Sequence, residues 1–321
     1  MLFRYIIRRG GDVVELRVLQ YFLAIAREES ISRAAEYLHI TQPTLSRQIK
    51  ELEDELGRRL FVRGSRKITL TEEGMLLRKR AEEITALLDK TESEIASAGE
   101  SVSGDVFVGC GETENMRFLV RAAKRLRDDY PGVYFHLFSG HEEAVAERLD
   151  KGLVDFALFI GQVKLEKYNY LTLPLEDVWG VIMRNDNPLA AKRSIRPADL
   201  EGVPLICSRQ MLDNNEMSGW LGRDFHEMEI AATYNLIYNA ALMAEEGIGV
   251  VLTLKGLGGV HPGGAVCFRP LEPTVTARLV LAWKKYQIFS RAAEKFLEYV
   301  QSAAAERGGE EATDMEGKND G

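Results

Sequence analysis

The chain has 321 residues, of which 45% are hydrophobic and 28% charged, and its formal net charge at pH 7 is −8. This length and composition allow two folded domains, and no hydrophobic run approaches the roughly 18–20 residues of a membrane span. The short N-terminal run is too brief and too basic for a secretory signal. Three scattered cysteines argue against a disulfide framework and against a four-ligand zinc site. We therefore expect a cytoplasmic protein.

Residues 1–14 show no pattern of a helix or strand and contain Gly10-Gly11. We expect a disordered N-terminal extension, although its three arginines leave a flexible basic arm as the alternative. From residue 15 the pattern becomes helical. The predicted helix Glu15–Glu28 has a core face formed by Leu19, Phe22, Leu23 and Ala26.

Two further helices are predicted, with a tight turn at His39-Ile40 between them. The first covers Ser32–Leu38, with its first residue as the N-cap. The second begins after a capping Thr41, carries Pro43 in its first turn and stops at Gly57. Its apolar face is formed by Leu45, Ile49, Leu52 and Leu56.

The opposite face of the second helix gathers short hydrogen-bonding side chains and cations in its N-terminal half: Gln42, Thr44, Ser46, Arg47 and Lys50. A helix that enters the major groove of DNA by its amino end needs this layout, because its amides and polar side chains then meet phosphates and base edges. Glutamine can pair with adenine and arginine with guanine. The two helices alone leave an ordinary helical hairpin with a solvated polar face as the alternative.

Residues 60–74 predict a small β-hairpin, in which two short apolar strands enclose a basic Gly-Ser tip. From Leu16 to Gly74 the chain resembles the winged helix-turn-helix of LysR-type transcriptional regulators. The matching segments are Leu19–Phe22, Ala34–Leu38, Gln42–Ile49, Leu52-Glu53, Leu56-Gly57, Leu60-Phe61 and Leu70–Gly74. The resemblance implies a DNA-binding domain over residues 15–72. The candidate DNA contacts are Arg33, Thr41, Gln42, Pro43, Thr44, Ser46, Arg47, Lys50, Arg63, Arg66 and Lys67.

The net charge of −8 fits a DNA-binding protein once it is divided along the chain. Residues 15–71 hold ten Lys/Arg against eight Asp/Glu, and residues 1–14 hold three against one, so each segment carries +2. The remaining chain therefore carries −12. Phosphates would attract the first part and repel the second, which would orient the molecule on DNA.

Residues 73–99 predict a long polar helix with one narrow apolar seam. The seam recurs in alternating steps of four and three: Leu77, Ala81, Ile84, Leu88, Thr91, Ile95 and Ala98. Such a seam suits a partner helix better than a globular core, so we predict a dimerisation and linker helix, with a lone solvated linker as the alternative. The resemblance implies an antiparallel pair, and dimers that join into a homotetramer and bend DNA.

After a hinge at residues 100–104, strands and helices alternate in a βαβαβ pattern that implies a parallel sheet. Strands are predicted at residues 105–110, 133–138, 155–160, 178–183, 204–207, 229–234, 248–252, 265–268 and 277–283, and helices at residues 116–128, 142–151, 236–246 and 290–305. This α/β region resembles the LysR-type effector domain, which is similar to periplasmic binding proteins in having two subdomains and a ligand cleft. By that resemblance the effector-binding domain covers residues 104–305, with subdomain I at 104–174 and 277–305 and subdomain II at 175–276. The acidic, Gly-rich residues 306–321 are expected to form a disordered tail.

In open α/β sheets, ligands bind beyond the carboxyl ends of the strands, beside helix N-termini. The candidate effector site there is Glu112, Thr113, His141, Glu142, Ile160, Gly161, Cys207, Ser208, Arg209, Tyr234, Asn235 and Tyr238. Free helix amides and Arg209 favour a small carboxylate, whereas Glu112, Glu114 and Glu142 would repel one. A polar or amine-bearing effector therefore remains open, and a plain capping or core role is the alternative for each of these residues.

An enzyme built on the α/β half is the main rival class. The sequence has no Gly-x-Ser-x-Gly, P-loop or His-Glu-x-x-His motif, and its five histidines do not cluster. We therefore expect no catalytic residue, metal or cofactor. A redox-sensing regulator is a second alternative, because Cys110 and Cys207 fall at strand ends, but no basic cluster is evident to lower a thiol pKa. A DNA-binding protein without an effector is the third.

The expected partners are double-stranded DNA, further copies of the chain and a small-molecule co-inducer. RNA polymerase is a possible further partner, and no membrane is expected among them. The mechanism that the resemblance implies is a population shift, in which the effector changes the angle between the subdomains and hence the spacing of the DNA-reading heads.

Overall fold

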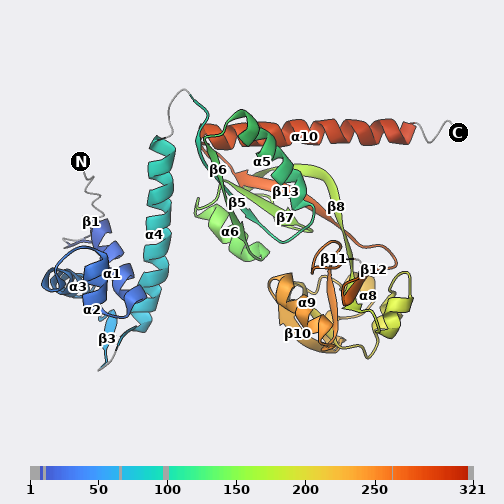
Figure 1. The fold of residues 1–321 in the computed structure, drawn as a ribbon, viewed down its shortest axis with the longest axis horizontal. Helices are drawn as coiled ribbons and strands as arrows, with labels where there is room; N and C mark the ends of the chain where they lie inside the picture. The colour runs from blue at the N-terminus through green and yellow to red at the C-terminus, as the bar shows by residue number, and fades with distance from the viewer. Residues whose placement is uncertain (1–7, 10–11, 65–66, 97–100, 262, 317–321) are drawn as a thin grey trace. The chain divides into compact units, whose positions relative to one another are not determined.

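The computed structural model describes residues 8–9, 12–64, 67–96, 101–261 and 263–316 (Figure 1). The chain divides into two compact units, Met1–Ser93 and Glu94–Gly321, and each is described by itself. Within the described residues, no helix is both long enough and apolar enough to cross a membrane.

The N-terminal unit begins with a short antiparallel pair, β1 (Arg8–Arg9) and β2 (Asp12–Val13). The prediction of a wholly disordered extension is therefore wrong for these residues, while residues 1–7 and 10–11 lie outside the described ones. Strands of two residues are far shorter than the usual five or six. They are too short to leave a detectable alternation of polar and apolar residues.

Three helices, α1 (Leu16–Glu28), α2 (Ile31–Tyr37) and α3 (Gln42–Leu56), surround one hydrophobic core. The buried side chains of this core include Leu19, Phe22, Ile25, Ala34, Ala35, Leu45, Ile49 and Leu52. The predicted N-cap of α2 was wrong, because the Ser30 hydroxyl, and not that of Ser32, accepts the hydrogen bond from the Arg33 N–H. Leu56 was also predicted to be buried, but it is 41% exposed because α3 ends there.

The predicted hairpin is present as β3 (Phe61–Arg63) and β4 (Ile68–Leu70), which pair antiparallel. α4 (Glu72–Ala96) follows directly. A Cβ atom at Gly74 would lie 2.1 Å from the Leu60 carbonyl oxygen, so the first turn of α4 packs against the start of the hairpin at a distance that only glycine allows. Residues 97–99 of the predicted linker helix lie outside the described residues.

Subdomain I of the C-terminal unit contains three parallel strands, β5 (Gly104–Cys110), β6 (Val133–Ser139) and β7 (Phe156–Ile160). α5 (Met116–Asp129) and α10 (Arg291–Glu316) lie side by side on one face, and α6 (Glu142–Asp150) covers the other (Figure 1). Successive residues of β5 serve the two faces. Val106 and Val108 join the core with α5 and α10, whereas Phe107 packs beside α6.

Subdomain II is built in the same way. Its strands are β9 (Leu205–Ser208), β10 (Ile230–Tyr234), β11 (Val250–Leu254) and β12 (Val266–Pro270). α9 (Ile237–Glu245) covers one face. The other face is covered by α7 (Arg209–Asp213), α8 (Ser218–Leu221) and three 3₁₀ turns, Pro188–Ala191, Pro197–Leu200 and Phe225–Glu227.

Two long strands, β8 (Tyr168–Arg184) and β13 (Thr276–Lys284), connect the subdomains. The strand order is β10-β9-β11-β8-β13-β7-β5-β6, with β12 on β8. The predicted strand at residues 178–183 is only the second half of β8, because the first half, with Pro174 and acidic residues, breaks the apolar pattern. The prediction of a parallel sheet is wrong for these two strands, which pair antiparallel with each other and with β7 and β11.

The prediction of a disordered tail from residue 306 is wrong as far as Glu316, because α10 continues to that residue. The segment around this point, Ser302-Ala-Ala-Ala-Glu-Arg307, consists largely of strong helix formers. Its helical preference outweighs the two glycines that follow. Residues 317–321 lie outside the described residues.

Candidate functional site

The amino end of α3 is open to solvent. Thr41 holds the N-cap position with an extended backbone, as predicted, but its side chain makes no capping hydrogen bond. Its hydroxyl lies 2.8 Å from that of Thr44 instead. Pro43 occupies the first turn, where its missing N–H costs nothing. The positive end of the helix dipole therefore faces outward, where an anion such as a phosphate can approach.

The polar face of α3 is displayed rather than packed. The exposed side chains among the candidate DNA contacts on it are Gln42, Pro43, Thr44, Arg47 and Lys50, and Ser46 is half-buried. Arg47 is 71% exposed and makes a loose ion pair, 3.8 Å, with Glu51 one turn later. Such exposed pairs contribute little to stability, so this guanidinium can exchange its partner for a base or phosphate.

The other cations of this unit are held in more varied ways. The Arg33 guanidinium donates to the Glu28 carbonyl at the end of α1. Lys67 lies 3.4 Å from the Glu29 carboxylate. Arg63 ends β3 and pairs with Ile68 across the hairpin, and Arg66 lies outside the described residues. The structure thus brings Arg63 and Lys67 to one hairpin, apart in sequence from α3.

Glu53 plays a part in this unit that the sequence analysis missed. Its side chain is 8% exposed, and one carboxylate oxygen accepts from the N–H groups of Leu60, at 2.7 Å, and Phe61, at 3.2 Å. Arg59 lies 3.6 Å from the other oxygen. Glu53 therefore ties the carboxyl half of α3 to the hairpin, and fixes these two elements relative to each other.

A cavity of about 590 Å³ opens in the C-terminal unit. Its lining comes from loops at the carboxyl ends of β5, β6, β7, β9 and β10, together with parts of β8 and β11. Both subdomains contribute, so the cavity is a cleft between them. The candidate residues that line it are Glu112, His141, Glu142, Ile160, Ser208, Arg209, Tyr234 and Asn235.

Four candidates are not among the described lining residues: Thr113, Gly161, Cys207 and Tyr238. Cys207 is fully buried in the core on the far side of β9, because successive strand residues alternate faces. Tyr238 is 72% exposed on α9. Gly161 has a φ of +86° and donates its N–H to the Arg278 carbonyl at the crossover strand. Thr113 is buried, and its hydroxyl donates to the Asp177 carboxylate.

Two hydrogen-bonded contacts bridge the cleft. The Glu112 carboxylate of subdomain I accepts from the Ile237 N–H at the amino end of α9, at 2.7 Å. Gln210 of subdomain II donates to the Glu142 carboxylate at 2.6 Å, and its amide oxygen accepts from the Glu142 N–H at 3.2 Å. These contacts hold the two subdomains in the observed arrangement.

Carboxylates dominate the cleft: Glu112, Glu142, Glu143, Asp213 and Glu216. Among the described lining residues, Arg209 is the single Lys or Arg. Partial burial and the neighbouring charge of Glu216 raise the pKa of Glu142, while the hydrogen bond from Gln210 lowers it. Burial also raises the pKa of the Tyr234 hydroxyl, which donates to the Leu252 carbonyl. A negatively charged group in a ligand would be repelled by the carboxylates that line the cleft.

A buried carboxylate lies beside the cleft, where β8 and β13 cross between the subdomains; we call this crossover the hinge of the effector domain. Asp177 of β8 pairs with Ala277 of β13, where the chain crosses between subdomains. One of its oxygens accepts from the Thr113 hydroxyl, at 2.8 Å, and from the Asn115 side-chain amide, at 2.7 Å. The other oxygen is buried without a partner in the described structure. Burial raises the pKa of Asp177, although both hydrogen bonds oppose the shift.

Comparison with known proteins agrees with this architecture. Residues 16–75 match the model of the bacterial regulatory helix-turn-helix protein, lysR family, and residues 99–305 match that of the LysR substrate binding domain. The chain belongs to the LysR family. It is a DNA-binding transcriptional regulator with an effector-binding domain, and the α/β fold expected from the sequence is confirmed.

Two curated relatives cover much of the chain. The Hca operon transcriptional activator HcaR of Escherichia coli K12 is 29% identical over 91% of this chain and 99% of its own length. The regulator BsdA of Bacillus subtilis 168 is 30% identical over 68% of this chain and 74% of its own. Among solved structures, full-length CbnR complexed with its target DNA has a TM-score of 0.71 at 19% identity, and covers 91% of this chain and 100% of that one.

Two of the three cysteines of this LysR-family chain, Cys110 and Cys207, lie in buried surroundings. Cys110 is 5% exposed and Cys207 is fully buried. Burial raises the pKa of Cys110, and it raises the pKa of Cys207 to about 11. A raised pKa lowers the fraction of reactive thiolate. Neither thiol therefore has the environment of an oxidant sensor.

Several cleft residues escaped the sequence analysis. They include Glu143, Trp179, Gln210, Asp213, Asn214, Glu216, Thr233, Ile237, Thr253 and Leu257. Gln210 directly follows a candidate residue, and Ile237 lies in the first turn of the helix predicted at residues 236–246, so the helix-start argument could have reached both. Asn214 and Glu216 lie in the α7–α8 segment, which has no periodic pattern, and only the folded chain brings them to the cleft.

Proposed function

We propose that this LysR-family protein binds a specific DNA site through α3 and the β3–β4 hairpin, and that a small molecule in the cleft controls this binding. The observation that carries the DNA half is the exposed polar face of α3, with an uncapped amino end. The relative CbnR was solved with its target DNA, which supports the same use of the matching unit here.

The cleft supports the regulatory half of the proposal. Its volume of about 590 Å³ falls within the roughly 300–1,000 Å³ of small-molecule sites. Both subdomains line it, and two hydrogen bonds bridge it, one accepted by Glu112 from the Ile237 N–H and one donated by Gln210 to Glu142. A ligand that competes for these groups changes the relative stability of open and closed arrangements, which is how a small molecule shifts a population.

We further propose that the protein acts as a homodimer through α4 and as a homotetramer on DNA. α4 uses Leu77 and Ala81 against its own unit, while Ile84 and Ile95 of the same seam are 41% and 71% exposed. A second α4 helix would cover them. We also propose that the protein acts in the cytoplasm and can contact RNA polymerase. We propose, in addition, that it has no cofactor and no enzymatic activity.

The first experiment is a selection of genomic fragments by the full-length protein, followed by footprinting at two salt concentrations. We expect a protected, partly palindromic site and steep salt dependence, because phosphate contacts release counterions. The genes beside the site then nominate candidate effectors. Binding without sequence preference would contradict the proposal.

The same assay tests one residue. We expect Arg47→Ala to weaken specific binding by about 1–3 kcal/mol, while binding to random DNA changes less, if its guanidinium is bidentate to a guanine. Arg78→Ala is the matched control, because Arg78 is also an exposed arginine paired with a glutamate one turn later, but it lies on α4. Equal losses on specific and random DNA would remove Arg47 from base recognition.

A further inference from the structure

Two of the helix amino ends at the cleft, those of α6 and α9, are already occupied by acceptors from the opposite subdomain. The Glu142 N–H, in the first turn of α6, donates to the Gln210 amide oxygen at 3.2 Å. The Ile237 N–H, the first residue of α9, donates to the Glu112 carboxylate at 2.7 Å. Helix N-termini are the usual places where a protein receives an anionic ligand. In this cleft the protein's own side chains fill them.

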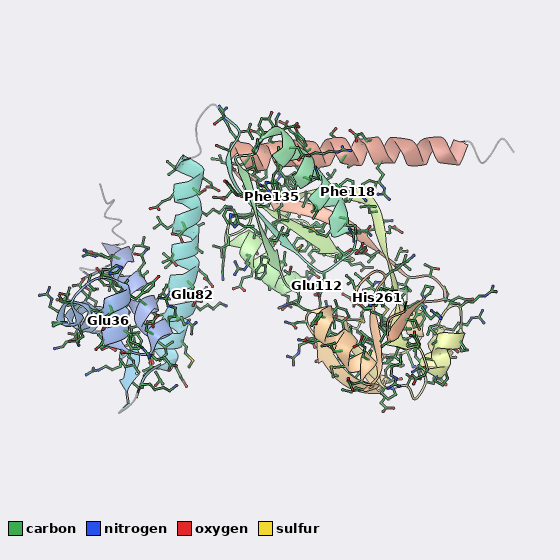
Figure 2. The ribbon with its side chains drawn as sticks, viewed as in Figure 1. Glu36, Glu82, Glu112, Phe118, Phe135 and His261 are labelled. Carbon is green, nitrogen blue, oxygen red and sulfur yellow. The ribbon has the colours of Figure 1, made fainter. Side chains whose placement is uncertain are left out.

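The α9 site is the stronger of the two. The helix has nine residues, and its N-cap Leu236 provides no side-chain acceptor. Glu112 supplies a full negative charge there from a position 125 residues away in the chain. Figure 2 shows Glu112 where the green elements of subdomain I approach the orange α9. Its carboxylate therefore takes the place that the carboxylate of a ligand would take.

The rest of the lining complements a cation. With Glu112 engaged, Glu142, Glu143, Asp213 and Glu216 still face the cavity, against one arginine. Trp179, Phe159 and Leu257 add apolar and aromatic surface, which suits the body of a small organic molecule and, for the aromatic rings, a cationic group. A carboxylate ligand brought into this cleft would meet an excess of carboxylates over the single arginine, and an α9 amino end that Glu112 already fills.

We propose that Glu112 is a specificity-determining residue, a tethered anion in the α9 site, and that the cleft selects an effector with a protonated amine over one with a carboxylate. The inference rests on the proposed function, because it assigns the chemical class of the effector. It predicts that removal of the Glu112 side chain opens an anion site at the Ile237 N–H.

Two probes that differ only in charged group test the proposal on the full-length protein. Benzylamine and benzoate are titrated by calorimetry, and the Ile237 amide resonance is followed by NMR. In the unsubstituted protein we expect tighter binding of benzylamine. In Glu112→Ala we expect benzoate to gain about tenfold in affinity, within the range of a charge at a helix N-terminus, with a shift of the Ile237 resonance on benzoate addition.

Two further variants separate the effect of filling the Ile237 N–H with an acceptor from the effect of the negative charge on Glu112. Glu112→Gln keeps an acceptor for the Ile237 N–H, so it should weaken benzylamine binding without a comparable gain for benzoate. Glu114→Gln removes the same charge two residues away, where the side chain is exposed and paired with Arg117 outside the described lining. It should leave the ranking of the two probes unchanged.

The outcomes separate this inference from the proposed function. If Glu112→Ala shows no gain in benzoate affinity and no benzoate-dependent Ile237 shift, the tethered-anion proposal is overturned. Tighter benzoate than benzylamine binding in the unsubstituted protein also overturns it, while leaving an effector in the cleft. The proposed function fails separately, if compounds that bind the cleft never change the DNA footprint.

Discussion

The DNA-binding unit and the effector domain present their polar groups in opposite ways. On α3, Thr44, Arg47 and Lys50 project into solvent from one rigid helix, whose other face is fixed in the core. In the cleft, Glu112 and Gln210 are already engaged with the facing subdomain. The polar face of α3 is therefore already exposed in the absence of a partner. In the function we propose, a ligand in the cleft exchanges these internal contacts for its own, so that binding there is linked to the subdomain arrangement.

The largest effect should follow from removing the support of the first surface. Leu45 is fully buried beneath α3, and we expect Leu45→Ala to destabilise the N-terminal unit by about 2–5 kcal/mol through lost burial and a cavity. Specific DNA binding should fall with it. Calorimetry of the full-length protein should show the unfolding transition of the N-terminal unit moving to lower temperature, while the transition of the effector domain stays in place.

Leu56→Ala provides the control for that comparison. It is the same substitution on the same helix, but at a side chain that is 41% exposed, so the expected loss is below about 1 kcal/mol. If both variants shifted both transitions together, the two units would unfold as one, and the support of α3 could not be separated from the stability of the effector domain.

A smaller effect should separate the stability of α3 from its attachment to the hairpin. Glu53→Ala leaves the buried Leu60 N–H without its acceptor, at a cost of about 1–3 kcal/mol, and frees the hairpin relative to α3. Glu53→Gln keeps an acceptor oxygen and should cost less. Chemical denaturation measures both, with the exposed neighbour Asp54→Ala as the control. Equal stability of all three variants would show that the carboxylate is not structural.

How far the sequence could predict each region follows from how its residues are arranged. The residues of α3 are contiguous in the sequence, so the spacing of Leu45, Ile49 and Leu52 reveals its buried face. The polar residues between them mark its exposed face. Glu53 was missed because an acid in a polar run predicts a solvated side chain. Only the hairpin packed against α3 turns it into a buried acceptor.

The cleft depends on contacts that no local pattern contains. Strand ends located Glu112, Glu142 and Ser208 near the cavity, because parallel strands end at one edge of the sheet. The same rule misplaced Cys207, whose side chain alternates to the opposite face of β9. That Glu112 would cap α9 across 125 residues follows from the folded arrangement alone, and this contact is the basis on which we propose an amine-bearing effector, which the sequence analysis had left open beside a carboxylate.

The smallest predicted effect lies at the hinge of the effector domain. Burial raises the pKa of Asp177 above its ordinary 3.8. The folded state therefore binds a proton more tightly than the unfolded state. The stabilisation that this provides is fully present below the unfolded pKa and is lost as pH rises through the folded pKa. The thermal stability of the effector domain should include this decline between acid and neutral pH.

Asp177→Asn isolates that contribution, because the amide oxygen still accepts from Thr113 and Asn115 but cannot ionise. Its new N–H₂ group occupies the place of the unpartnered oxygen, a cost that does not vary with pH. The midpoint difference between variant and unsubstituted protein should therefore move in favour of the variant as pH rises through the folded pKa of Asp177. Scanning calorimetry across the acid range measures it. Asp186→Asn, at an exposed acid just beyond the end of β8, is the control of opposite sign, because the hydrogen bond from Arg184 lowers the pKa of Asp186. Parallel pH profiles for Asp177→Asn and the unsubstituted protein would mean that the Asp177 carboxylate does not titrate in this range.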